Sequence, residues 1–412
     1  MKAIEVEQGT GAAASRRPIP FARTEICEEA CEAADRVLHS GWVTSGPEVV
    51  AFERELADWV QAQHGVAVAS CTVAIELALR ALRLPAGAKV LVSTMTFCGA
   101  VHAVVHAGLT PVLADVGDAT LMPDPSTVAA AAERAGGVDA MVVVHFAGFP
   151  APVEELAAAA GLPLARVVED AAHALGTWVD DRPVGAISAA TCFSFYATKN
   201  LPIGEGGMVT TADPALADYV RRGRLHGMSK DAWKRYLPGA PWYYNVDIAG
   251  LKANMTDLQA AIGRAQLRRL AGWQERRADL AGAYDEGLAG IPGLRPPPRP
   301  ERGRHAWHLY VIRVEPGFGL GRDDLIAELA DRGVGCSVHF IPVHHQPYFR
   351  ELLGEEGVGH LPQADAAFQE IVSLPMHTAL TLADVDRVCD ELRDLGRRRR
   401  ARGNGRPQGT AP

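Results

Sequence analysis

The residues of this chain that could do covalent chemistry lie at the ends of short apolar segments. Lys199 follows the largely apolar run 193–197 and precedes a glycine-rich turn at 204–207. Burying a protonated amine costs free energy, so a lysine placed there is either paired with an acid or has a lowered pKa. In the second case it is a nucleophilic amine that can form an imine with a carbonyl compound. Both interpretations are open from this feature alone.

An acid and a histidine follow another apolar segment. Glu169 and Asp170 end the run 167–170, and His173 comes three residues later. A carboxylate at the end of a buried strand can enter a cleft and hold a cationic ring nitrogen. The competing interpretations are that Asp170 caps the next turn and that His173 is an ordinary, partly buried histidine.

A candidate anion site lies at 69–74, where a predicted strand passes through small and hydroxyl-bearing residues directly into a predicted helix. Free N–H groups and the positive end of the helix dipole favour an anion at such a place. The alternative is that Ser70 or Thr72 simply caps the helix. The chain has neither the glycine pattern of dinucleotide-binding folds nor that of P-loop nucleotide-binding proteins. A phosphate site must therefore be built in another way.

These groups together fit one cofactor, pyridoxal 5'-phosphate. It needs a lysine for its imine, a carboxylate for its pyridine nitrogen, an anion site for its phosphate and a flat side chain against its ring. Phe97, after the predicted strand 89–93, is the candidate for the ring contact. An aromatic residue in that position can also be part of the core.

The elements that must position these residues alternate regularly between 65 and 225. Seven β-rich runs are separated by alanine-rich helical segments, at 66–69, 89–93, 110–115, 140–145, 166–169, 189–195 and 207–211. This alternation predicts an α/β fold with a mostly parallel seven-stranded sheet covered by helices. Ligands of such sheets bind beyond the carboxyl ends of the strands.

The chain divides into four predicted parts. Residues 1–20 form a flexible tail, 21–290 a large α/β domain, 291–396 a smaller α+β domain and 397–412 a disordered basic tail. A long helical stretch at 255–288 precedes the proline-dense linker 291–302. In the small domain we expect strands at 307–314 and 336–341 and helices at 322–331, 363–372 and 382–395.

Composition narrows the class of partner. The 412 residues are 48% hydrophobic and 22% charged, with a formal net charge of −8. An acidic chain offers no basic field for nucleic acid, and no apolar stretch approaches the roughly 20 residues that span a membrane. Residues 1–17 lack the apolar centre of a signal peptide, so we expect a cytoplasmic location. The seven cysteines are scattered, with no zinc-ligand spacing, so we expect reduced core thiols and no metal.

Six ordered motifs carry a family resemblance. They stand at 41–47 (GWVTSGP), 70–74 (SCTVA), 169–173 (EDAAH), 194–200 (SFYATKN), 204–207 (GEGG) and 255–261 (MTDLQAA). Together they closely resemble the nucleotide-sugar aminotransferases of the DegT/StrS family, which have the type I fold of pyridoxal phosphate enzymes. The resemblance covers residues 18–396, and six motifs in order are far more specific than any one of them.

The resemblance implies roles for individual residues. Lys199 matches the lysine that forms the imine, Asp170 the carboxylate at the pyridine nitrogen and His173 a hydrogen-bonding group near the 3'-oxygen. Phe97 matches the ring-stacking aromatic. Ser194, Thr72 and the backbone amide of Val73 match the family's phosphate-binding groups. Many members have alanine at the position of Val73, a difference that leaves the backbone donor in place.

The loop 250–255 (GLKANM) departs from the family's tyrosine-containing pattern. In the family this loop reaches the cofactor of a neighbouring subunit. The resemblance therefore implies a homodimer, with Lys252 and Asn254 as candidate cofactor-binding residues.

The resemblance also implies an activity. It predicts transfer of the amino group of L-glutamate to a nucleotide-linked ketosugar, specifically dTDP-4-keto-6-deoxyglucose, in deoxyaminosugar and secondary-metabolite biosynthesis. The segments 225–236 and 252–255 resemble members acting on 4-keto sugars, and 339–348 resembles loops of that group that face the sugar or the diphosphate. Basic groups near 224–235 and in the small domain are expected to bind the diphosphate. Candidate substrate residues are Trp42, Thr44, His344 and Tyr348.

Three alternatives stay open. One is amination of a 3-keto sugar. Another is a sugar dehydratase of the same fold, which would carry histidine in place of Lys199. The third is a regulator that binds pyridoxal phosphate without turnover.

Overall fold

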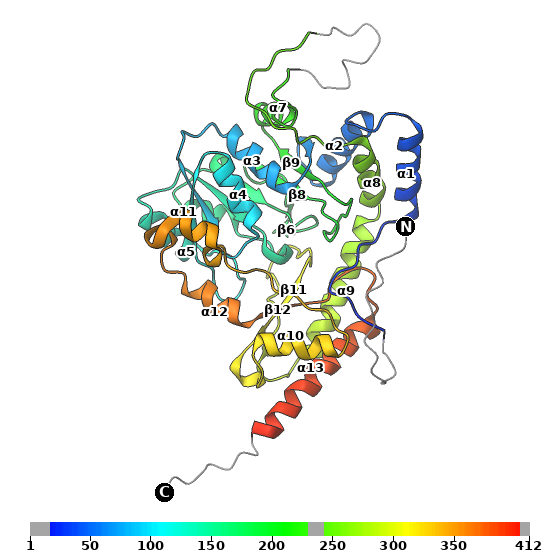
Figure 1. Cartoon of the computed structure of the whole chain (residues 1–412), viewed down its shortest axis with the longest axis vertical. Coiled ribbons are helices and arrows are strands. Elements are labelled where there is room, and N and C mark those ends of the chain that lie inside the picture. Colours follow the sequence, from blue (N-terminus) through cyan, green and yellow to red (C-terminus); the bar gives the residue numbers. More distant parts are fainter. Residues whose placement is uncertain (1–16, 230–242, 404–412) are drawn as a thin grey trace.

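The computed structural model describes residues 17–229 and 243–403, which form a large sheet-containing domain and a smaller domain below it (Figure 1). The central sheet has seven strands in the order β1-β9-β8-β5-β4-β2-β3. Their bounds are β1 (His64–Val68), β2 (Lys89–Ser93), β3 (Thr110–Ala114), β4 (Ala140–Val144), β5 (Val167–Asp170), β8 (Ala190–Ser194) and β9 (Gly207–Thr211). Each one overlaps a predicted strand.

Only β9 runs against the other strands of this sheet, because it pairs antiparallel with both β1 and β8 while the remaining pairs are parallel. The predicted mostly parallel sheet is therefore confirmed. Its strands read as continuous apolar runs because both faces are covered.

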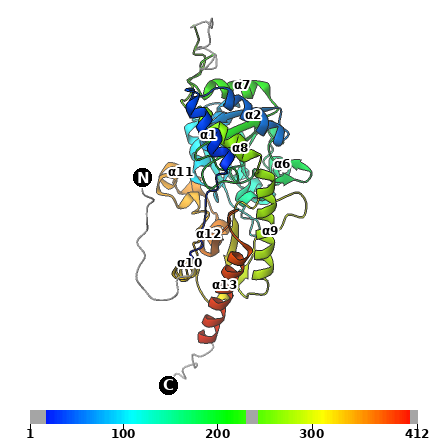
Figure 2. The ribbon, with the colours of Figure 1, turned by 90° about the vertical axis from the view of Figure 1, so that its right-hand side faces the viewer.

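Helices cover the sheet on both sides (Figures 1 and 2). The apolar core on one face includes residues of α3 (Cys71–Ala81), α4 (Cys98–His106) and α7 (Pro214–Gly223). The cores on the other face include residues of α2 (Pro47–Trp59), α5 (Pro125–Arg134), α6 (Val153–Ala159) and α8 (Asp257–Leu267). Alternate residues of one strand serve opposite faces, as Val167 and Val168 do.

The amino-terminal helix α1 (Glu28–His39) packs on α8 through Ala33, Val37 and Ala261. The predicted helical stretch 255–288 is two helices, α8 and α9 (Leu270–Leu288), separated near Arg268. The long α9 leads from the large domain into the small one (Figure 2). A short hairpin, β6 (Trp178–Val179) and β7 (Arg182–Pro183), lies outside the main sheet.

The small domain is built on an antiparallel sheet of β10 (Leu294–Arg295), β11 (Tyr310–Val314) and β12 (Ile371–Leu374). Its helices are α10 (Arg322–Asp331), α11 (Pro347–Val358), α12 (Pro362–Glu370) and α13 (Leu382–Gly403). Its core contains a stacked pair, Tyr284 of α9 and Tyr310, with ring centroids 4.7 Å apart.

The predicted strand at 336–341 is wrong. Ser337 makes a single bridge to Ser373, and the third strand of the small sheet is β12, which overlaps the end of the predicted helix 363–372. All of β12 is buried, whereas residues 336–341 are only partly covered and pass beside the cavity described below. Both 336–341 and 371–374 are rich in apolar residues, but only 371–374 is fully buried and pairs as a strand in the small sheet.

Residues of both predicted tails that the structure describes have defined positions. Ile19 is 2% exposed within the small-domain core and bridges Val334 in parallel. At the other end, α13 continues past Arg397 to Gly403.

Within the described residues, no helix is long and apolar enough to cross a membrane. The seven cysteines are all unpaired, and Cys31 is exposed rather than part of the core.

Candidate active site

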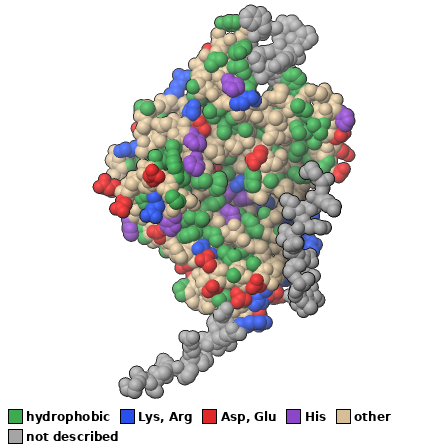
Figure 3. All heavy atoms as spheres, viewed as in Figure 1, with side chains coloured by type: hydrophobic (Ala, Val, Ile, Leu, Met, Phe, Trp, Pro, Cys, Tyr) green, Lys and Arg blue, Asp and Glu red, His purple; other side chains and the backbone are tan. Residues whose placement is uncertain are grey.

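A cavity of about 500 Å³ opens beyond the carboxyl ends of β2, β4, β5 and β8, where the small domain meets the sheet. This is where an open parallel sheet is expected to bind its ligand. Apolar and histidine side chains occupy much of the middle of the molecular face shown in Figure 3. The predicted residues that line the cavity are Thr72, Phe97, Asp170, His173, Ser194 and Lys199.

Lys199 is presented by the turn that follows β8, where its N–H donates to the carbonyl of Tyr196 at 2.8 Å. Desolvation lowers the pKa of Lys199 to about 8, although the negative charge of Asp170 acts in the opposite direction. The prediction of an amine with a lowered pKa is therefore confirmed, and a neutral amine is accessible near physiological pH.

Asp170 is the last residue of β5 and is 7% exposed. Its Oδ1 accepts hydrogen bonds from the backbone N–H of Ala172 at 3.0 Å and from the Cys71 thiol at 3.7 Å. Burial raises the pKa of Asp170, while these donors and Lys199 lower it. The capping interpretation is therefore confirmed, and the carboxylate also lines the cavity, where it could meet a ring nitrogen.

His173 is held as a neutral ring. Its Nδ1 accepts from the N–H of Ala147 at 3.3 Å, which leaves the ring proton on Nε2. Desolvation and the nearby Lys199 keep the pKa of His173 well below its ordinary value. Its ring lies 4.3 Å from that of His308 and is stacked on Phe340 at 5.7 Å.

The amino end of α3 forms another part of the cavity. Ser70 is the N-cap, and its Oγ accepts from the N–H of Val73 at 3.3 Å. The capping interpretation is therefore confirmed for Ser70. Val73 is absent from the residues that line the cavity, so its amide is not the open donor that we expected.

Thr72 and Ser194 provide hydroxyl groups beside this helix end. Room there depends on Gly99, because a Cβ at that position would lie 2.7 Å from Oγ1 of Thr72. A helix amino terminus with hydroxyl donors around it fits a phosphate group.

Phe97 is not a core residue, since 61% of its surface is exposed. It stands just before α4, and its ring centroid is 6.1 Å from that of Phe340. A flat, exposed ring on the cavity wall fits a contact with an aromatic cofactor. The amine, carboxylate, helix end and aromatic ring that pyridoxal phosphate requires therefore meet in one cavity.

Several cavity residues escaped the sequence analysis. His145, which follows β4, is fully buried, and its Nε2 lies 2.9 Å from Oε2 of Glu169. Glu169 also accepts hydrogen bonds from Ser188 and Thr191. His308, His339 and Phe340 come from the small domain. The one sequence signal was a glutamate inside an apolar strand, which predicts a buried partner.

The four predicted substrate residues do not line the cavity. Trp42 donates to the carbonyl of Ser45 at 3.1 Å, and the carbonyl of Thr44 accepts from the N–H of Asp257 at 3.0 Å. His344 is bound to other side chains, and Tyr348 lies beside His102 with ring centroids 5.7 Å apart.

Lys252 and Asn254 also lie outside the cavity of this single chain and hydrogen-bond to each other. Asn254 donates to the hydroxyl of Ser45 at 2.7 Å. Of the basic segment 224–235, residues 230–235 lie outside the described residues, as does Tyr236. Arg224 itself is buried and paired with Glu53, so it cannot reach a diphosphate.

Comparisons with known proteins agree with this geometry. The model of the DegT/DnrJ/EryC1/StrS aminotransferase family matches residues 24–393. The spore coat polysaccharide biosynthesis protein SpsC of Bacillus subtilis is 44% identical over 92% of this chain and 97% of its own.

Solved structures of similar fold include two sugar-modifying enzymes. The putative sugar aminotransferase Spr1654 of Streptococcus pneumoniae, in its PMP form, has a TM-score of 0.84 and 31% identity, covering 92% of this chain and 100% of its own. DesI, solved in the presence of its TDP-sugar product, has a TM-score of 0.82 and 32% identity, covering 96% and 98%. The chain therefore belongs to the DegT/DnrJ/EryC1/StrS aminotransferase family and is a sugar aminotransferase that depends on pyridoxal 5'-phosphate.

Proposed function

We propose that this enzyme transfers the amino group of L-glutamate to C4 of a nucleotide-linked keto-deoxysugar, specifically dTDP-4-keto-6-deoxyglucose. The observation that carries the proposal is the Lys199 amine, with its pKa lowered to about 8, in a cavity that also holds Asp170. The TDP-sugar product of the similar enzyme DesI supports the nucleotide.

When bound, pyridoxal phosphate supplies an electron sink and a carrier for the amino group. Lys199 would hold it through an imine. With the cofactor loaded, the neutral amine of Lys199 would act as the base that takes the proton from Cα of the amino donor, and its ammonium form would act as the acid that gives the proton back. Its lowered pKa suits both directions of proton transfer near neutral pH.

The other cavity residues would orient the cofactor. Asp170 would keep the pyridine nitrogen protonated, and the Nε2–H of neutral His173 would donate to the 3'-oxygen. Thr72 and Ser194, at the amino end of α3, would bind the phosphate, and Phe97 would cover the ring. The fit of these groups to one cavity supports each assignment.

The sugar nucleotide would enter the cavity from its solvent-exposed side. His339 and Phe340 form the wall contributed by the small domain and would contact the sugar. We propose that the active form is a homodimer in which Lys252 and Asn254 reach the partner's cofactor. The exposure of Lys252 supports this arrangement.

The cellular context that we propose is deoxyaminosugar biosynthesis in the cytoplasm, with antibiotic-type secondary metabolites as the end products. The similarity to SpsC, which is named for polysaccharide biosynthesis, favours a polysaccharide sugar as the second candidate product.

The test is a screen of purified enzyme with glutamate and nucleotide-linked 4-keto and 3-keto sugars. The product is followed by mass, and the position of its new amine is determined by NMR. Amination at C4 is expected. Amination at C3 would refute the proposed carbon, and binding of pyridoxal phosphate without turnover of any ketosugar would favour a regulator.

Lys199→Ala is the control, because it should lose both turnover and the covalent attachment of pyridoxal phosphate by borohydride reduction. Reduced wild-type protein carrying the pyridoxyl group on another lysine would overturn the assignment of Lys199.

A further inference from the structure

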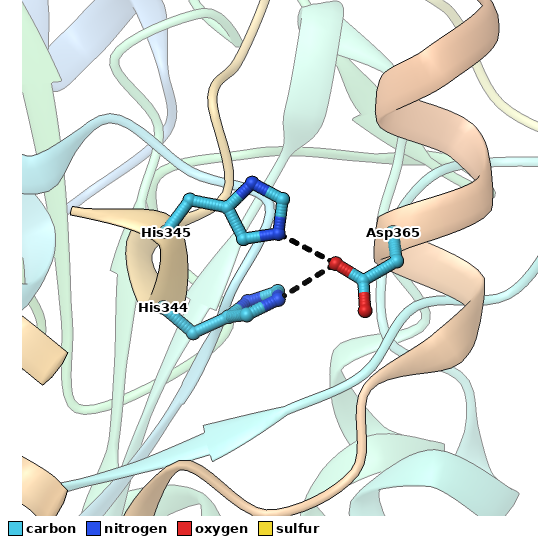
Figure 4. Close-up of side chains that lie close together, drawn as sticks. All are labelled: His344, His345 and Asp365. Atoms are coloured by element: carbon cyan, nitrogen blue, oxygen red, sulfur yellow. Dashed lines mark hydrogen bonds and ion pairs between the residues drawn. The ribbon is translucent and has the colours of Figure 1, made fainter. Parts of the chain in front are cut away.

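Three side chains of types that can bind a metal ion converge outside the cavity, close in sequence to its wall residues His339 and Phe340. His344 and His345 belong to the short 3-10 helix η5 (Val343–His345), and Asp365 belongs to α12. The Nε2 atoms of both histidines point at Oδ1 of Asp365, at 2.9 and 2.6 Å (Figure 4). Among the described residues, this is the one group of three or more such side chains close enough to share a metal ion.

The simpler interpretation is a tether between η5 and α12. A tether needs only one histidine, whereas here two rings stand nearly perpendicular, at 78°, and aim at the same oxygen. His344 is also fixed from behind, because its Nδ1 lies 2.7 Å from Oγ1 of the fully buried Thr94. Metal-binding histidines characteristically have the second ring nitrogen held in this way.

We propose that His344, His345 and Asp365 bind a zinc ion. Two imidazole nitrogens and one carboxylate oxygen form a recognised ligand set for Zn²⁺, which leaves the fourth tetrahedral position to water. If Nε2 of His344 binds the metal, the ring proton is on Nδ1. The Nδ1–H group then donates a hydrogen bond to Oγ1 of Thr94.

The geometry is close to what a metal requires. Tetrahedral ligands about 2.0–2.1 Å from zinc stand about 3.3 Å from one another. The Nε2 atoms of His344 and His345, now 2.9 and 2.6 Å from Oδ1 of Asp365, must therefore move away from it by about 0.4 and 0.7 Å. His345 and Asp365 reach the surface, which gives the ion a path of entry.

The site would strengthen one wall of the cavity. The N–H of Val343 donates to the carbonyl of Thr94, at the end of β2, at 2.8 Å, and the chain just before it carries His339 and Phe340. A metal at His344 and His345 would join this segment to α12 as well. Zinc binding should therefore stabilise the folded protein, since a ligand that binds only the folded state raises its stability.

The experiment is titration of the enzyme loaded with pyridoxal phosphate with Zn²⁺, by calorimetry and by thermal unfolding. We expect one zinc ion per chain at this site and a rise in Tm. His345→Ala, which removes a partly exposed ligand, should weaken binding at least about tenfold and reduce the rise in Tm at the same zinc concentration. Asp365→Asn should act in the same direction.

The matched control is His39→Ala. His39 also lies near an aspartate, with 3.3 Å between its Nδ1 and a carboxylate oxygen of Asp35, but it belongs to no three-ligand cluster. Its loss should leave zinc affinity unchanged.

A crystal soaked in Zn²⁺ should show an anomalous peak between Nε2 of His344, Nε2 of His345 and Asp365. No zinc bound at this position, or His345→Ala binding zinc as wild type does, would overturn the proposal. Neither result bears on the amination reaction.

Discussion

Replacing Asp170 with asparagine should lower the pKa of Lys199 further in the protein without cofactor. The wild-type pKa is about 8 against 10.5 for an ordinary lysine, and the charge of Asp170 is the principal influence that raises it. At pH 7.5 about a quarter of Lys199 is then neutral, compared with about one in a thousand for an ordinary lysine. If Asp170→Asn lowers the pKa of Lys199 further, to about 7, roughly three quarters of the amine is neutral at pH 7.5.

Only the neutral amine is acylated, so the rate of labelling of Lys199 reports its pKa. Labelling by a small acylating reagent, followed over pH by peptide mass spectrometry, should have a midpoint near pH 8 in wild type. Asp170→Asn should label about threefold faster at pH 7.5, with an unchanged rate at high pH.

Asp218→Asn makes the same chemical change on the exposed face of α7, where Asp218 pairs with Arg222, and should leave Lys199 unchanged. A wild-type midpoint near pH 10.5, or a midpoint in Asp170→Asn equal to or above that of wild type, would refute the reasoning.

Three further outcomes follow from the structure. In the loaded enzyme, Asp170→Asn should retain pyridoxal phosphate but form pyridoxamine phosphate from glutamate orders of magnitude more slowly in stopped-flow absorbance; a near-normal rate would remove Asp170 from the mechanism. Glu169→Ala leaves His145 buried without its partner and should cost about 3–5 kcal/mol of unfolding free energy in urea, where a loss below about 1 kcal/mol would contradict it. Asp257→Ala removes the acceptor for the N–H groups of Gly46 and Val49 at the start of α2 and should cost about 2 kcal/mol, whereas an unchanged denaturation midpoint would show that water replaces the cap.

The sequence by itself determined the large domain and the chemical core of the site. All seven strands were predictable because strands buried on both faces must be apolar along their whole length. Lys199 and Asp170 stood out because charged side chains at the ends of such strands are costly without a use or a partner. Phe97 was predictable as a candidate by the same reasoning about strand ends.

Tertiary structure decided what depends on contacts between distant segments. His145 and Glu169 are 24 positions apart and become partners only because β4 and β5 are neighbours in the sheet. From the sequence, the basic segment that begins at Arg224 was expected to bind a diphosphate. In the structure Arg224 is buried and paired with Glu53.

The small domain shows the same limit. Its third strand is β12 rather than 336–341, because the choice depends on which segment pairs with β11. The placement of His344 beside Asp365, and not in the cavity, likewise depends on where α12 packs. The local sequence indicates which segments are buried and where turns occur. It does not indicate which distant segment packs against a given strand or helix.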